Sequence, residues 1–197
     1  MTEIDRLREQ LDELAGRLDR VESVQAIERL AARYTLAADS RDLDGLVGLF
    51  VDDVDCGRLG TGRDALRESY EVVHRQFYRT VHHVTGQTIE FASDDRATGT
   101  VTMRAEHEVS ARWVVAALCM FDTYERRAGQ WYFVRRKPES WYTVNEGDAP
   151  AGPEWSAAGW ASRPPRLPGL FPTWNEFWDR RPDRVAELTD HPIAPVN

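Results

Sequence analysis

The chain has 197 residues, 42% of them hydrophobic, and a formal charge of −8, which suits one domain with a full core plus an extension. Because acidic and basic residues are mixed along the chain, we expect neither nucleic acid nor an anionic membrane as a partner. The sequence contains no spanning apolar run and no signal peptide, so we expect a cytoplasmic protein in which Cys56 and Cys119 are reduced thiols rather than a disulfide or zinc ligands.

The first predicted helix has apolar residues three and four positions apart from Ile4 to Val21. This spacing is a heptad seam, although it is shorter than the roughly 3 to 4 heptads of an independent coiled coil. Two interpretations stay open: a helix packed on its own domain, or a helix that contacts another subunit. We treat residues 1–21 as a separate N-terminal amphipathic helix.

A second helical stripe, shifted in phase, covers residues 24–38 and ends near Asp42, which is placed to cap a short helix over 43–50. A glycine-rich break precedes a third helix over 63–77. Four β-rich runs with hairpin-type turns follow, at residues 80–92, 97–110, 113–126 and 131–144. Helices followed by a strand meander predict an α+β fold, in which N-terminal helices pack on a curved antiparallel sheet to form a cone-shaped α+β barrel.

We expect the cone domain to cover residues 22–145 and a Pro/Trp-rich C-terminal arm to cover 146–197. Most of the seven Trp residues fall in this arm. Disordered segments are poor in aromatic residues, so we expect the arm to dock its aromatic side chains on a surface.

Alternation along the second predicted strand places His107 and Met103 on its apolar face. A lone histidine in such a place is more often a core residue, satisfied by the backbone, than a functional group. His82 and His83 open the preceding strand, one facing in and one facing out. Counting alternate residues back from the end of the strand turns His83 inward, but a bulge at Gly86 would reverse the faces before it. The choice between His82 and His83 therefore stays open.

Tyr34 and Asp39 stand near the end of the second helical stripe. The helix macrodipole disfavours a carboxylate there, and violations of local rules concentrate at functional sites. Asp39 is therefore a candidate functional residue, whereas Asp42 is explained as a cap.

Several further pieces of the chain have a characteristic order and spacing: residues 26–34, 39–42 and 80–82, followed by Tyr124 to Arg127, Gly129 and Trp131. In these pieces the chain resembles the nuclear transport factor 2-like superfamily, in its scytalone dehydratase and SnoaL-like branch. The resemblance covers roughly residues 22 to 143 and leaves the arm unexplained.

The resemblance implies roles for single residues. Asp39 and His82 fall on the catalytic aspartate and histidine of scytalone dehydratase, bile acid 7α-dehydratase and hexachlorocyclohexane dehydrochlorinase. The separation of His82 and His107 matches that of the two active-site histidines of scytalone dehydratase. Tyr34 resembles the active-site tyrosine of the bile acid enzyme. Ala38 stands where scytalone dehydratase has a tyrosine, which tells against scytalone itself as the substrate.

Substrate contacts are expected from three further residues. Arg136 lines up with an arginine of the dehydrochlorinase pocket, although Arg135 is adjacent to it. Met103 and Phe121 are the expected apolar contacts. No cofactor is implied, and we expect no metal, because the chain shows neither HxH nor HxxxH chelate spacing.

The resemblance thus implies a dehydratase-type lyase that acts on a small hydrophobic cyclic substrate, such as a polyketide, steroid or aromatic intermediate. Asp39 would orient His82 as general base, Tyr34 would hydrogen-bond an enolate, and His107 would protonate or hydrogen-bond the leaving hydroxyl. A polyketide cyclase, a ketosteroid-type isomerase or a non-catalytic ligand-binding module remain alternatives. Relatives of this fold imply a homo-oligomer, with a trimer favoured.

Overall fold

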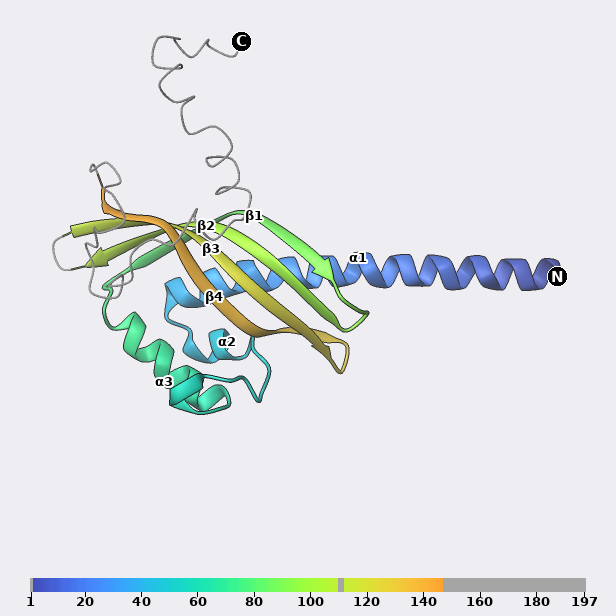
Figure 1. Ribbon diagram of the computed structural model, residues 1–197, viewed down its shortest axis with the longest axis horizontal. Coiled ribbons are helices and arrows are strands. Elements are labelled where there is room, and N and C mark those ends of the chain that lie inside the picture. The colour runs from blue at the N-terminus through green and yellow to red at the C-terminus, as the bar shows by residue number, and fades with distance from the viewer. Residues whose placement is uncertain (1, 110–111, 147–197) are drawn as a thin grey trace, which may run out of the picture. The chain divides into compact units, whose positions relative to one another are not determined.

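The computed structural model describes residues 2–109 and 112–146 (Figure 1). Its elements are the helices α1 (Glu3–Ser40), α2 (Leu43–Val47), η1 (Gly57–Leu59) and α3 (Arg63–His74) and the strands β1 (Thr80–Phe91), β2 (Arg96–Val109), β3 (Arg112–Arg127) and β4 (Gln130–Asn145). The predicted order of helices and strands is confirmed. Apart from residue 146, the predicted C-terminal arm lies outside the described residues. No helix within the described ranges is long and apolar enough to cross a membrane.

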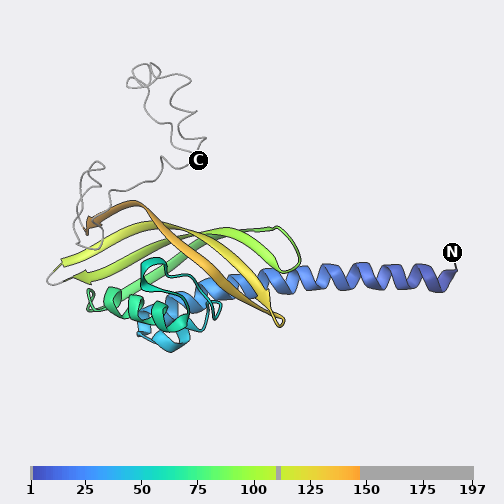
Figure 2. The same cartoon turned by 60° about the horizontal axis from the view of Figure 1, so that its bottom comes forward.

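The four strands form one antiparallel sheet in the order β1-β2-β3-β4. The tight turn between β3 and β4 contains Ala128 and Gly129, which have φ angles of 48° and 77°. Positive φ at both central residues is the geometry of a type I′ hairpin turn, in agreement with the predicted turn. Figures 1 and 2 show the sheet curving over the helices, all of which lie on one of its faces. The predicted α+β cone architecture is confirmed.

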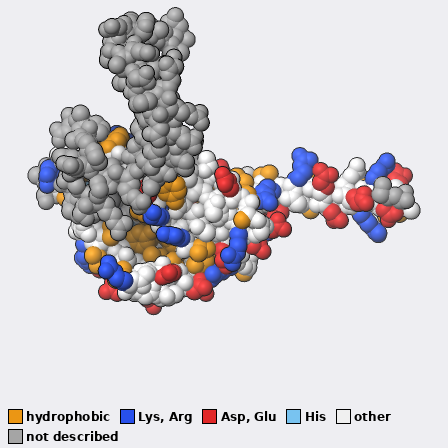
Figure 3. Space-filling model, in the orientation of Figure 1, with side chains coloured by type: hydrophobic (Ala, Val, Ile, Leu, Met, Phe, Trp, Pro, Cys, Tyr) orange, Lys and Arg blue, Asp and Glu red, His pale blue; other side chains and the backbone are white. Residues whose placement is uncertain are grey.

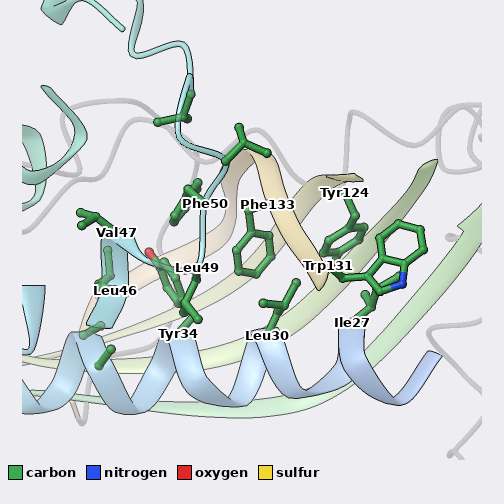
Figure 4. Close-up of a cluster of buried hydrophobic side chains, with 14 of the residues drawn as sticks. Ile27, Leu30, Tyr34, Leu46, Val47, Leu49, Phe50, Tyr124, Trp131 and Phe133 are labelled. Atoms are coloured by element: carbon green, nitrogen blue, oxygen red, sulfur yellow. The ribbon is translucent and has the colours of Figure 1, made fainter. Parts of the chain in front are cut away.

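The main core lies between α1 and the sheet (Figure 4). Ile27, Leu30 and Tyr34 of α1 pack in one cluster with Tyr124 and Phe133 of the sheet. The segment after α2 closes this cluster, because its backbone hydrogen-bonds to both the backbone N–H and the backbone carbonyl of Phe133 in β4. A second buried cluster consists of Ala31, Val101, Met103, Ala105, Ala116, Leu118 and Met120. These two cores hold the C-terminal half of α1 against the sheet.

The two helical stripes predicted before residue 40 belong to one continuous helix, not to two. No proline interrupts this helix, so the shift in phase changes which face is apolar without ending the hydrogen-bonded ladder. At about 100° per residue, the buried stripe that contains Ile27, Leu30 and Tyr34 lies on one face of α1. The seam from Ile4 to Val21 lies on the opposite face and is exposed.

Candidate active site

A cavity of about 360 Å³ lies between the end of α1, α3 and the sheet. Small-molecule sites in proteins usually span roughly 300 to 1,000 Å³, so a compact ring compound fits this volume. Much of the wall is apolar. The aromatic, imidazole and guanidinium side chains that reach it are Tyr34, Tyr70, His74, Phe77, His82, His107 and Arg136.

Asp39 and His82 meet at the cavity. His82 Nδ1 lies 2.6 Å from Asp39 Oδ1, and the His82 backbone N–H donates to Oδ2 over 2.8 Å. The Thr80 hydroxyl donates to Oδ1 over 2.7 Å. Because an ionised carboxylate only accepts hydrogen bonds, Nδ1 of His82 carries the proton, and Nε2 is left as the basic nitrogen.

Asp39 is held in its ionised form. Burial raises the pKa of this carboxyl, but the hydrogen bonds from His82 and Thr80 outweigh burial and bring the pKa below its ordinary value. These donors explain why an aspartate is tolerated in the last turn of α1, since β1 supplies the partners that the helix terminus lacks.

Arg41 joins the end of α1 to β1 and was not singled out in the sequence. It adopts a left-handed backbone conformation, with φ of 62°. Its guanidinium donates to the Ala38 carbonyl over 2.7 Å, to Thr80 Oγ1 over 2.8 Å and to the Phe77 carbonyl over 3.0 Å. Arg41 therefore positions the threonine that hydrogen-bonds to Asp39.

His82, not His83, lines the cavity. The register between β1 and β2 shifts between Val84 and Gly86, so one extra residue interrupts the alternation. Residues before the bulge therefore face the opposite side from the one expected by counting alternate residues back from the end of β1. The His83 side chain points away from the cavity, is 54% exposed and lies 3.7 Å from Glu106.

His107 is buried at the cavity wall, as the strand alternation predicted. Its ring is nearly perpendicular to that of His82, with 5.6 Å between the ring centres, and packs on Phe77 at 4.6 Å. Burial, assisted by repulsion from His82, lowers the pKa of His107 to about 3. A neutral imidazole can donate one N–H to a leaving group but cannot act as an imidazolium acid at physiological pH. Of the two roles expected from the sequence, His107 can therefore hydrogen-bond the leaving hydroxyl but not protonate it as an imidazolium.

We expect His107 to make stability depend on pH. Its folded-state pKa lies below the ordinary value of 6.5, so the unfolded chain binds more protons below pH 6.5 and the unfolding free energy falls as the pH drops. From about pH 7 to pH 5 this histidine should account for a loss of roughly 1–2 kcal/mol. Urea unfolding at both pH values should show a smaller loss for His107→Leu. The control His83→Leu removes an exposed histidine of β1 and should leave the wild-type loss unchanged; an equal loss in all three proteins would contradict the expectation.

Tyr34 and Tyr70 form a hydrogen-bonded pair at the cavity. The Tyr70 hydroxyl donates to that of Tyr34 over 3.2 Å, which leaves the Tyr34 proton available to a ligand. Burial raises the pKa of both phenols, so both stay protonated. Tyr70 was not predicted as a site residue, because its role as a partner of Tyr34 depends on how α3 packs in the tertiary structure.

His74 is the third histidine on the cavity wall, and it was not predicted as a site residue. Its ring lies 5.7 Å from that of Tyr70, centre to centre. Burial lowers the pKa of His74 to about 4, and Nδ1 is buried with no hydrogen-bond partner among the described residues. A ligand group in the cavity could satisfy this nitrogen.

Arg136 reaches the cavity from β4, while Arg135 lines grooves outside it. Nε and Nη2 of Arg136 donate to the two carboxylate oxygens of Asp122 over 3.1 and 3.0 Å. The side chains of Arg136 and Asp122 are almost completely buried. The guanidinium lies 4.3 Å from the Tyr34 ring centre. Nη1 is buried with no partner among the described residues, so Arg136 keeps one nitrogen with unused N–H donors for a ligand. Asp122 was not predicted as a site residue.

The two expected apolar substrate contacts lie elsewhere. Met103 is buried in the second core cluster and is not on the cavity wall. Phe121 pairs with Thr100 across β2 and β3 and lines a groove on the other face of the sheet. The structure therefore does not support either residue as a contact in this cavity. Among the described residues, no three His, Cys, Asp or Glu side chains gather to hold a metal ion.

The comparisons with known proteins cover this same region. A family model described as SnoaL-like domain matches residues 19–137. Gamma-hexachlorocyclohexane dehydrochlorinase of Sphingobium indicum is 29% identical over 126 residues, which are 60% of this chain and 81% of that protein.

Two solved structures share the fold. A protein provisionally assigned as scytalone dehydratase, from Novosphingobium aromaticivorans, is 28% identical with a TM-score of 0.58, and the match covers 71% of this chain and 97% of that one. A hexachlorocyclohexane dehydrochlorinase from Novosphingobium barchaimii is 25% identical with a TM-score of 0.60, over 70% of this chain and 99% of that one. The family-model match includes every cavity residue except Pro138.

Proposed function

The chain belongs to the SnoaL-like domain family, and from this premise we propose that it is a cofactor-free lyase that catalyses β-elimination on a small hydrophobic cyclic substrate. The observation that carries the proposal is the hydrogen bond between Asp39 and His82 at the wall of a cavity. The names of the relatives support the same class of reaction, because a dehydrochlorinase and a dehydratase each remove a proton and a leaving group.

In the proposed reaction, Nε2 of His82 takes a proton from a substrate carbon. The electrons of that C–H bond form a C=C bond as the bond from the neighbouring carbon to oxygen or halogen breaks, and the leaving group departs with its electron pair. Asp39 stabilises the imidazolium that forms at His82. A positioned general base of this kind contributes roughly 10²- to 10⁴-fold to the rate.

The wall of the cavity favours a substrate with an acceptor group and no net charge. Asp122 already neutralises the charge of Arg136, so the remaining Nη1 donor suits a carbonyl, hydroxyl or halogen better than a carboxylate. The Tyr34 hydroxyl can donate to an enolate oxygen when the substrate carries a carbonyl. A ring intermediate of the polyketide, steroid or aromatic type would meet these requirements.

A ring-closing cyclase or ketosteroid-type isomerase is the second candidate, and the neutral state of His107 favours it. Hydroxide is a poor leaving group without an acid, whereas an isomerase needs only the base and a donor to the enolate. The product distinguishes the two reactions: elimination releases water or hydrogen halide, while isomerisation conserves mass.

The test incubates the full chain with β-hydroxy ketones of cyclic compounds and with γ-hexachlorocyclohexane in D₂O. We expect mass spectrometry to show loss of water, or a chloride assay to show loss of HCl, for at least one probe. Deuterium uptake by a ketone that loses neither water nor HCl would support the isomerase alternative. Binding of the probes without elimination or exchange would instead support the non-catalytic module and contradict both proposals.

Tyr34→Phe is expected to lower kcat on a carbonyl substrate by about 10- to 100-fold, because it removes one hydrogen bond to the developing enolate. Tyr70→Phe is the matched control: it breaks the same Tyr–Tyr hydrogen bond but leaves the Tyr34 hydroxyl in place. Steady-state kinetics should show the larger loss for Tyr34→Phe. Equal losses would mean that the pair acts only by packing.

A further inference from the structure

The N-terminal half of α1 carries a row of large aliphatic side chains that stay exposed in the described structure. Each is between 50% and 65% exposed. They are Ile4, Leu7, Leu11, Leu14, Leu18 and Val21, and we call this row the α1 seam. A continuous exposed apolar row of this kind marks an interaction surface.

The seam does not face its own domain. At about 100° per residue, it lies on the side of α1 opposite to the buried stripe around Ile27 and Leu30. The sheet hairpins meet α1 on that other side, where Asp19 pairs with Arg126 over 2.7 Å and the Arg20 guanidinium lies 3.9 Å from the Phe91 ring centre. The helix also continues beyond the end of the sheet in Figures 1 and 2. Packing on its own domain, one of the two interpretations of this segment, therefore does not account for the seam.

We propose that the α1 seam pairs with the seam of a second copy of this chain, as a parallel two-stranded coiled coil over residues 4–21. The seam is short for an independent coiled coil, but α1 continues to Ser40 and its C-terminal half is already held against the sheet as a helix. Ile4, Leu11 and Leu18 occupy the a positions of successive heptads, and Leu7, Leu14 and Val21 occupy the d positions. Residues at these positions interlock as knobs into holes across a pair of helices.

The charges beside the seam complement each other in the parallel register. There, each g residue meets the e residue five positions later in the other helix. Glu3 would meet Arg8 of the second copy, and Arg17 would meet its Glu22. The remaining pair in residues 3–22 joins uncharged side chains, so no like charges face each other. Figure 3 shows acidic and basic side chains along this projecting helix.

The placement of the folded domain is compatible with this pairing. Because the sheet contacts the face of α1 opposite the seam, the two domains would lie on the outer sides of the paired helices and would not collide. Each seam would leave water without any rearrangement of the cavity or the sheet.

The test compares the full chain with two single variants by sedimentation equilibrium. Leu14→Asp puts a charge into the seam, and Gly16→Asp adds the same charge two residues away, on the outer face, where an added Cβ meets nothing within 4 Å. We expect the wild type and Gly16→Asp at twice the chain mass of 22.5 kDa and Leu14→Asp at the monomer mass. A wild-type monomer or trimer, or a Leu14→Asp mass equal to that of the wild type, would overturn the proposal.

A crosslinking experiment fixes the orientation and does not depend on the folding of a charged variant. In a Cys56→Ser background, Leu14→Cys places thiols at facing d positions of a parallel pair, whereas Asp12→Cys places them on the outer face. Mild oxidation should give a disulfide-linked dimer on a non-reducing gel for Leu14→Cys only. No dimer from Leu14→Cys, or equal amounts from both variants, would contradict a parallel pair.

Discussion

Replacing His82 by glutamine is expected to lower kcat/KM by about 10²- to 10⁴-fold, the contribution of a general base, while the protein stays folded. Glutamine can still hydrogen-bond to Asp39 but has no basic nitrogen to present to the cavity. Steady-state kinetics on whichever probe the wild type converts, together with circular dichroism, measures both effects.

His83→Gln is the matched control, because it changes the neighbouring histidine, which is half exposed and faces away from the cavity. It should keep wild-type activity. Asp39→Asn tests the other half of the pair: its amide N–H would face His82 Nδ1, move the ring proton to Nε2 and remove the base. Near-normal turnover in either His82→Gln or Asp39→Asn would sink the assignment of this pair as the base.

The other large expected effect concerns the buried ion pair of Asp122 and Arg136. Asp122→Ala should lower the unfolding free energy by about 3–5 kcal/mol, because it leaves a guanidinium buried without its counterion. Arg136→Met should cost less. Burial already raises the pKa of Asp122, so the carboxyl left behind can take up a proton, whereas a guanidinium cannot lose one.

A double-mutant cycle separates the stability of this pair from its role in binding. In Asp122→Ala/Arg136→Met no buried charge remains, so urea unfolding should show the double variant to be more stable than Asp122→Ala. Its kcat/KM should stay low, because the Nη1 donor is gone. A double variant that is as unstable as the sum of its single changes would show that the two side chains do not interact.

The elements of the fold could be predicted because they follow from local rules. Alternating side chains, turn chemistry at Ala128 and Gly129, and the cap at Asp42 each act within a few residues. The predicted break after Val21 was wrong, because α1 is one continuous helix whose two halves lie in different environments. The shift in phase marks the change of environment along the helix. The C-terminal half of α1 meets the sheet, while the N-terminal half carries the exposed seam.

The pairing of Asp39 with His82 came from the family resemblance and from one broken local rule, not from periodicity. The choice of His82 over His83 required the bulge between Val84 and Gly86 in β1, which strand alternation cannot locate. Phe121 was expected as a substrate contact but lines a groove on the other face of the sheet, where it pairs with Thr100 of β2.

By itself, the sequence determined the helix-then-strand order, the strands, the buried position of His107 and the heptad spacing of the α1 seam. Only the tertiary structure decided that Tyr70, His74 and Arg136 converge on one cavity, that Asp122 holds Arg136, and that the seam faces away from its own domain. The reason is that periodicity records whether a side chain is buried, whereas the partners it meets depend on sheet register and helix packing between residues far apart in the chain.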